Sequence, residues 1–136
     1  MITFRHQIDP DLDSLTSCME EVTHAMEEAD CPAEDVFAAN LFIEELVTNT
    51  LKYGFDSRQP TPVDLVVHVF PKGFTVELSD QGDPFDPFAL PPPDFGQPAD
   101  ERPIGGLGIH LVKNLATECI YSRVDGKNLT IVKKYS

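Results

Sequence analysis

Three polar side chains share one strip of an otherwise apolar stretch of this sequence. Glu45, Asn49 and Lys52 have i, i+4 and i+7 spacing, which places them within about 60° of one another on a helix. A carboxylate, an amide and an ammonium group rarely occupy a buried helix without partners. The strip suits a metal ion and the phosphates that the metal bridges. The alternative is a surface stripe with one Glu–Lys pair, and this stretch alone does not decide between the two.

Two further segments carry residue types that nucleotide sites use. Asp80 and Gly82 follow a predicted strand, where a carboxylate can accept a hydrogen bond from an exocyclic amine and a glycine lets a flat base approach the backbone. The simpler interpretation of this pair is a turn. Gly105-Gly106-Leu107-Gly108 precedes a predicted helix, and its N–H groups and the helix N-terminus would attract an anion. It matches neither the dinucleotide fingerprint nor the P-loop, so it is weak when taken alone.

A long helix must position the first strip. Pro32 fits its first turn, and Gly54 fits the left-handed position after its last turn. Glu44 lies about 100° around the helix from Glu45 and is expected to be a surface or packing residue. Apolar side chains cover most of the circumference, so we expect the helix to be buried. These are Val36, Phe37, Ala39, Leu41, Phe42, Ile43, Leu46, Val47 and Leu51.

Hydrophobic periodicity predicts the remaining elements. Strands are expected at 2–8, 63–70, 74–79, 119–124 and 129–135, and further helices at 12–29 and 109–116. The first of these helices has a core stripe formed by Leu12, Leu15, Met19, Val22 and Met26. Asp125-Gly126 is a strong hairpin signal between the last two strands. The order β-α-α-β-β-loop-α-β-β predicts an α+β fold, a two-layer sandwich with helices on one face of a mixed, largely antiparallel sheet.

Residues 81 to 104 contain seven of the 12 prolines, and no regular element is expected there. A loop of this length in a compact domain is usually functional, for instance a lid, or else disordered. Its Phe85, Phe88 and Phe95 either fold over an apolar ligand face or pack on the core.

Composition narrows the class of protein. The 136 residues predict one domain, 1–136, and the net charge of −13 argues against nucleic acid and against an anionic membrane. A protein partner of basic or mixed charge is compatible. Cys18, Cys31 and Cys119 match no zinc or redox spacing, and no signal peptide or apolar run of about 20 residues occurs, so we expect a cytosolic protein with reduced thiols.

Taken together, Glu45-xxx-Asn49, Asp80-x-Gly82 and Gly105-Gly106-Leu107-Gly108-Ile109 resemble the motifs of the GHKL ATPase superfamily. This superfamily includes gyrase, MutL and histidine kinases, and it binds ATP in the Bergerat fold. The resemblance covers nearly the whole chain, with the motifs in the same order. Asp80-x-Gly82-x-Pro84-Phe85-Asp86-Pro87 and the segment 102–108 look most like the bacterial anti-sigma-factor serine kinases.

The resemblance implies a role for individual residues. Glu45 would be the general base, Asn49 the magnesium ligand, and Asp80 the carboxylate that binds adenine. Gly82 would lie under the base, and Gly106 and Gly108 would be the phosphate-binding glycines of the lid, whose main part is expected at 81–104. Thr130 would help Asp80 to hold adenine. The implied ATP-binding residues are Asn49, Lys52, Asp80, Gly82, Phe85, Gly105, Gly106, Leu107, Gly108 and Thr130, and the implied cofactors are ATP and Mg²⁺.

The sequence departs from the kinase pattern at two places. Tyr53 stands where many of these kinases have His, and Lys52-Tyr53 instead resembles the histidine-kinase version, in which the lysine approaches a phosphate. The lid is also unusually rich in proline. Histidine kinases often have Asn at the position of Glu45, whereas a serine hydroxyl needs a base. Glu45 therefore favours transfer to serine or to water.

The resemblance implies a cytoplasmic bacterial serine/threonine kinase that acts as an anti-sigma factor. Its substrate would be an anti-sigma-factor antagonist phosphorylated on Ser, and its second partner would be a sigma factor held by a homodimer, although the involvement of a sigma factor stays open. The first alternative is a nucleotide-sensing binding module with little kinase activity. The second, an ATPase domain detached from a sensor kinase, is disfavoured because we find no helical dimerisation segment in the chain.

Overall fold

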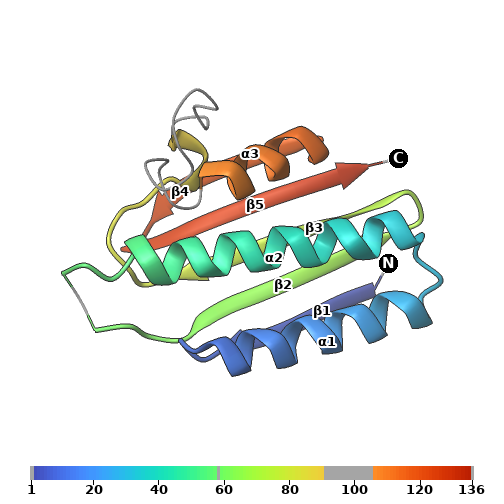
Figure 1. Cartoon of the computed structure of the whole chain (residues 1–136), viewed down its shortest axis with the longest axis horizontal. Coiled ribbons are helices and arrows are strands. Elements are labelled where there is room, and N and C mark those ends of the chain that lie inside the picture. Colours follow the sequence, from blue (N-terminus) through green and yellow to red (C-terminus); the bar gives the residue numbers. More distant parts are fainter. Residues whose placement is uncertain (1, 58, 91–105, 136) are drawn as a thin grey trace.

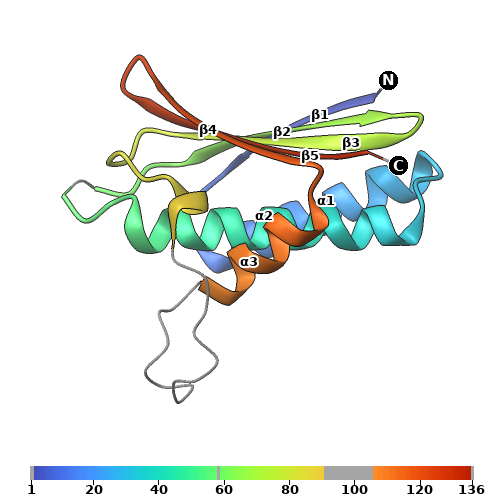
Figure 2. The same cartoon turned by 90° about the horizontal axis from the view of Figure 1, so that it is seen from above.

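Five strands form one antiparallel sheet, and the helices cover one of its faces (Figures 1 and 2). The computed structural model describes residues 2–57, 59–90 and 106–135. The strand order is β1-β2-β3-β5-β4, and each described pairing is antiparallel. The elements are β1 (Ile2–Ile8), α1 (Leu12–Glu28), α2 (Ala33–Tyr53), β2 (Val63–Phe70), β3 (Gly73–Asp80), η1 (Pro87–Ala89), α3 (Gly106–Leu115), β4 (Glu118–Val124) and β5 (Lys127–Tyr135). The predicted two-layer α+β fold and element order are confirmed.

The core lies between α2 and the central strands. Phe42 of α2 and Phe74 of β3 are fully buried, with ring centroids 5.7 Å apart. Truncating an aromatic side chain in such a position typically costs about 3–5 kcal/mol. Because α2 is held in this way against the sheet, its polar strip has a defined position relative to the ends of the strands.

The register of β3 and β5 decides which residues meet at the edge of the site. Asp80, the last residue of β3, pairs with Asn128, and Leu78 pairs with Thr130. The β4–β5 hairpin turns at Asp125 and Gly126, with φ of 51° and 77°. Positive φ at both central residues is the geometry that an Asp-Gly hairpin predicts.

Gly54 corrects a prediction about the end of α2. Its φ and ψ are −81° and −13°, which is right-handed rather than left-handed. Its N–H still bonds to the Thr50 carbonyl at 2.8 Å, so the helical pattern runs one residue further. The glycine is needed for space, because a Cβ there would lie 2.7 Å from the Thr50 carbonyl oxygen. Its own carbonyl accepts a hydrogen bond from the Asp83 N–H at 2.5 Å.

Two predicted core residues are exposed. Leu12 is 68% exposed and Phe37 is 66% exposed, whereas the rest of both apolar sets is buried or half-buried. Periodicity assigns a residue to a face of a helix, but only packing decides how much of a broad apolar surface is covered. Leu12, in the first turn of α1, lines an open groove between α1 and α2.

Two boundaries near the third helix also differ from the predictions. A single 3-10 turn, η1, forms within the stretch where no element was expected, because Pro87 fits a first helical position and the Asp86 carboxylate accepts a hydrogen bond from the Phe88 N–H at 2.9 Å. Helix α3 begins at Gly106 rather than at Ile109. Glycine is tolerated in a first turn, where N–H groups have no partner within the helix in any case.

The three cysteines are free, as predicted. Burial, and secondarily the charge of Glu21, raises the pKa of the Cys18 thiol to about 12, which makes this thiol unreactive. None of the helices within residues 2–57, 59–90 and 106–135 is both long and apolar enough to cross a membrane. The same residues contain no cluster of His, Cys, Asp and Glu able to hold a metal by themselves.

Candidate functional site

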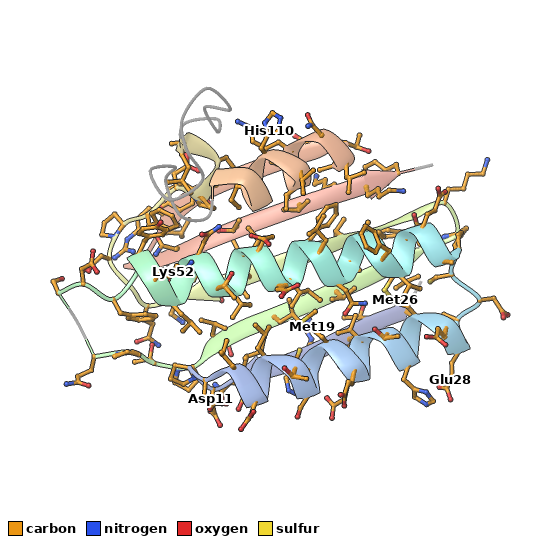
Figure 3. The ribbon with its side chains drawn as sticks, viewed as in Figure 1. Asp11, Met19, Met26, Glu28, Lys52 and His110 are labelled. Atoms are coloured by element: carbon orange, nitrogen blue, oxygen red, sulfur yellow. The ribbon has the colours of Figure 1, made fainter. Side chains whose placement is uncertain are left out.

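The polar strip of α2 is buried most deeply at its middle residue, and its first residue, Glu45, contacts α3. Asn49 is only 1% exposed, Glu45 is half-buried, and Lys52 lies exposed near the C-terminal end (Figure 3). Glu44 is exposed, as its angular position predicted, and it borders the groove on the other side of α2. Tertiary packing therefore separates two adjacent glutamates into different environments.

Asn49 carries a buried donor for which the described residues offer no partner. Its side-chain Nδ2 makes no hydrogen bond within the part of the chain that the structure describes. An unsatisfied buried amide typically costs about 1–3 kcal/mol, so a native protein that keeps one usually has a use for it. A ligand rich in acceptor oxygens, such as a polyphosphate with its bound metal, would satisfy this amide.

Glu45 meets the first turn of α3. A Cβ built at Gly108 would collide with the Glu45 carboxylate, and even the more distant oxygen, Oε1, would be 2.6 Å away. Glycine at 108 thus lets the helix N-terminus, with its free N–H groups, approach the carboxylate. Gly106 and Leu107 belong to the same helical turn, and Gly105 lies outside the described residues.

The environment of Glu45 favours its neutral form. Desolvation by burial is the main cause that raises the pKa of the Glu45 carboxyl, and repulsion from Glu44 adds to it. The positive charge of Lys52 opposes both effects. A carboxylate with a raised pKa is a stronger base than an ordinary glutamate, which suits proton abstraction.

Asp80 lies in a tight turn at the end of β3. Its Oδ1 accepts hydrogen bonds from the Gly82 N–H and from the Asn128 Nδ2, each at 2.9 Å. A Cβ at Gly82 would lie 2.9 Å from that same oxygen and would collide with the Gly54 carbonyl. The simpler expectation of a turn is therefore met, and the turn also leaves the second oxygen, Oδ2, without a hydrogen bond among the described residues.

Asn128 was missed by sequence reasoning. It is buried, and its Nδ2 also donates to the Asp83 carbonyl at 2.8 Å. Its Oδ1 accepts hydrogen bonds from Tyr121 Oη at 2.5 Å and from Arg123 Nη1 at 3.1 Å. The predicted strand began at 129, one residue too late to include Asn128. A strand extended toward the Asp-Gly turn would have placed it opposite Asp80.

Aromatic side chains border the same region. The rings of Tyr53 and Phe85 lie 5.2 Å apart, which brings the end of α2 and the start of the predicted lid together. Phe88 packs on the core instead, and its carbonyl accepts a hydrogen bond from Lys113 of α3 at 3.3 Å. Thr130 is buried two residue pairs beyond Asn128, and Phe95 lies outside the described residues.

A wide groove lies elsewhere on the molecule. It measures about 650 Å³ and lies between α1 and α2, where Leu15, Met19 and Glu44 are among its lining residues. Its volume alone would make this groove a candidate ligand site. We place the candidate site at Glu45, Asn49 and Asp80 instead, because the orphaned amide and the glycines packed against carboxylates occur there.

The sequence matches one protein-family model and resembles several protein kinases. A family model described as a histidine kinase-like ATPase domain matches residues 8–134. The serine-protein kinase RsbW of Listeria innocua is 25% identical over 95 residues, which cover 67% of this chain and 60% of that protein. The serine/threonine-protein kinase BtrW of Bordetella bronchiseptica is 23% identical over 100 residues, which cover 74% of this chain and 70% of that protein.

A solved structure has the same fold. The crystal structure of the RsbU and RsbW domains of Rv1364c from Mycobacterium tuberculosis superposes with a TM-score of 0.69 over 99% of this chain and 32% of that chain. The sequence identity is 11%, so this likeness concerns the fold alone. The kinases named above agree with the narrower resemblance to anti-sigma-factor serine kinases. Since the family model spans residues 8–134, the chain belongs to the histidine kinase-like ATPase domain family, which confirms the resemblance to the GHKL superfamily.

Proposed function

We propose that this protein is an ATP-dependent serine/threonine kinase that acts as an anti-sigma factor and phosphorylates an anti-sigma-factor antagonist on Ser. The observation that carries the proposal is the contact of the Glu45 carboxylate with Gly108 at the N-terminus of α3. It brings a base of raised pKa to a helix terminus suited to phosphate. The similarity to named serine kinases supports transfer to serine.

Membership of an ATPase family implies the use of ATP, and the described residues fit that ligand. The Oδ2 of Asp80, which accepts no hydrogen bond among the described residues, suits the exocyclic amine of adenine, and Gly82 gives the base room. Lys52, Phe85 and Thr130 are assigned to the same nucleotide site, as are the glycines 105, 106 and 108 and Leu107.

Asn49 is the proposed magnesium ligand. The ion would be bound by its Oδ1, while its buried Nδ2, which has no partner among the described residues, can donate a hydrogen bond to a phosphate oxygen. Magnesium usually takes few protein ligands and keeps several waters. When bound, the ion would neutralise charge that develops on the transferred phosphoryl group. The chain's own contribution is to hold the amide in place through the packing of α2.

Glu45 would accept the proton from the substrate hydroxyl. As the serine Oγ forms its bond to the γ-phosphorus, the bond from that phosphorus to the ADP oxygen breaks, and the bonding pair leaves with ADP. The positive charge of Lys52 opposes the upward shift in the pKa of the Glu45 carboxyl, and so favours the carboxylate form that can accept a proton. We assign residues 81–104 to a lid over this site and 1–136 to one domain.

The partners follow from the same proposal. The net charge of −13 is compatible with basic or mixed protein surfaces rather than with nucleic acid or an anionic membrane. We propose an anti-sigma-factor antagonist as substrate, a sigma factor as second partner, a homodimer as the assembly, and the bacterial cytoplasm as the location.

The test compares two neighbouring glutamates. Purified Glu45→Gln protein should bind ATP like the wild type but transfer phosphate to candidate antagonist domains about 10²–10⁴-fold more slowly, the usual worth of general base catalysis. Glu44→Gln is the matched control, because Glu44 is exposed on the other side of α2. Calorimetry measures binding, and labelled ATP measures transfer.

Two outcomes would contradict the proposal. If the wild type transfers no phosphate to any antagonist, and its choice of partner depends on ATP, the protein is a nucleotide-sensing module with little kinase activity. If Glu44→Gln abolishes transfer and Glu45→Gln does not, the assigned face of α2 is wrong, and the role of Asn49 falls with it.

A further inference from the structure

We propose that Asn128 is a positioning residue that makes the nucleotide site selective for a purine bearing an amine at C6. The inference rests on the proposed function, since it concerns how Asp80 would recognise the base. Asn128 does not touch the base in this proposal. It acts by fixing which carboxylate oxygen of Asp80 remains available and in which direction it points.

The orientation of the Asn128 amide is determined by its surroundings. Its nitrogen faces two acceptors, Asp80 Oδ1 at 2.9 Å and the Asp83 carbonyl at 2.8 Å. Its oxygen faces donors from Tyr121 and Arg123 and, at 3.4 Å, the Phe85 N–H. A flipped amide would set its oxygen against two acceptors, so only one orientation satisfies this buried group.

This arrangement fixes Asp80 in turn. Two donors, the Asn128 amide and the Gly82 N–H, share the Oδ1 atom. Arg123 secures the same turn from the other side by donating to the Gly82 carbonyl at 2.7 Å. With Oδ1 engaged and the turn anchored, Oδ2 is the oxygen left to face a ligand.

Oδ2 of Asp80 can distinguish between purine bases, because it accepts a hydrogen bond from one and not from another. A carboxylate only accepts hydrogen bonds. Adenine offers an amine at C6, whereas hypoxanthine and guanine carry an oxygen there, which would place two acceptors together. A site built to bond a ligand donor rejects an analogue that lacks it more strongly than an apolar pocket can. We therefore expect the protein to bind ATP at least about 10-fold more tightly than ITP.

Replacing Asn128 with aspartate tests the mechanism. In Asn128→Asp an oxygen replaces the amide nitrogen beside Asp80 Oδ1 and the Asp83 carbonyl, and two carboxylates at that distance must share a proton. Asp80 can then act as a donor. ATP affinity should fall about 10-fold or more, and the preference for ATP over ITP should shrink toward one or reverse.

The experiment measures ATP and ITP binding to the full chain, with magnesium, by calorimetry. Asn128→Ala should also lower the ATP:ITP affinity ratio, because Asp80 loses one of its two fixing donors. Tyr121→Phe, which removes one donor to the Asn128 oxygen, should lower it less. Asn114→Asp on exposed α3 is the matched control and should leave the ratio unchanged.

The ratio separates positioning from a merely structural role. A loss of stability alone weakens ATP and ITP binding together, so an unchanged ratio in Asn128→Ala and Asn128→Asp would overturn the inference. If neither 128 variant folds, the result for Tyr121→Phe decides in the same way. A third outcome is that the wild type prefers ATP to ITP and Asp80→Asn abolishes ATP binding, but substitutions at position 128 leave the ATP:ITP affinity ratio unchanged. In that case only this inference fails, and the proposed function stands. If wild type binds neither nucleotide, the proposed function fails as well.

Discussion

The proposed catalytic residue Glu45 also affects the stability of the folded chain. Burial on α2 disfavours its charged form, and Glu44 adds repulsion, so the pKa of the Glu45 carboxyl is raised in the folded chain. Its charge at neutral pH therefore lowers the stability of the folded state relative to an ordinary surface glutamate. Functional sites commonly carry such a cost.

The first prediction concerns Glu45→Gln and pH. The variant should have a higher melting temperature than the wild type at pH 7, because glutamine removes the cost of the buried charge. A raised folded-state pKa costs stability fully above that pKa and not at all below the unfolded-state value. The difference in melting temperature should therefore shrink as the pH falls toward about 4. Scanning calorimetry across this pH range measures it, and a difference that persists or grows in acid would contradict the assignment.

The second prediction concerns the unpartnered amide of Asn49. Asn49→Leu replaces a buried, unsatisfied donor with an apolar group of similar size, so the ligand-free fold should become about 1 kcal/mol more stable. Magnesium-dependent ATP binding should be lost in the same variant. Urea denaturation and calorimetry measure the two effects. If Asn49→Leu is less stable than the wild type and still binds ATP with magnesium, the Asn49 side chain has only a structural role.

At the scale of elements, one buried ion pair ties α2 to β5. Asp35, in the first turn of α2, is 4% exposed, and its carboxylate bonds to Lys134 Nζ at 2.7 Å. The carboxylate also lies near the positive end of the helix dipole. Asp35 lies in the first turn of α2 and Lys52 in its last turn, so the pair fixes the helix at the end away from the candidate site.

The third prediction concerns this pair. Asp35→Ala should lower the free energy of unfolding by about 3 kcal/mol, because Lys134 is left largely buried without its partner. Glu34→Ala, in the same first turn but exposed, should cost under about 1 kcal/mol. Asp35→Ala combined with Lys134→Met should recover much of the loss, which a double-mutant cycle in urea detects. Additive losses would mean that the pair contributes no coupling.

At the scale of the whole molecule, the candidate site joins segments that are far apart in the chain. The end of α2, the turn after β3, the first turn of α3 and the start of β5 all contribute. A ligand that bridges them would stabilise the folded chain as one unit, because it binds only when all of them are assembled.

The fourth prediction follows from this convergence. ATP with magnesium at about 100 times its Kd should raise the free energy of unfolding by about 2.7 kcal/mol. Asp80→Asn should abolish most of this gain while leaving the ligand-free melting temperature close to that of wild type. Gly108→Ala should reduce it too, since a Cβ there would collide with Glu45 and push away the first turn of α3, which is assigned to phosphate binding. Thermal denaturation with and without nucleotide measures each gain, and an undiminished gain in Asp80→Asn would contradict the adenine assignment.

The sequence by itself determined the elements and most of their order. Apolar spacing predicted α1, α2 and all five strands to within a few residues, because a side chain's face follows directly from its position in a helix or strand. Asp125-Gly126 predicted the hairpin because few residue pairs tolerate positive φ twice. The strip containing Glu45 and Asn49 was visible for the same local reason.

Only the tertiary structure decided how distant residues meet. Asn128 bonds to Asp80 across 48 positions, and Gly108 contacts Glu45 through the packing of α3 on α2. Neither relation has a local spacing, because each depends on strand register or helix packing. Gly54 illustrates the same limit. Its place at a helix end suggested a left-handed cap, but the constraint on it is space beside Thr50, together with a carbonyl that must meet Asp83.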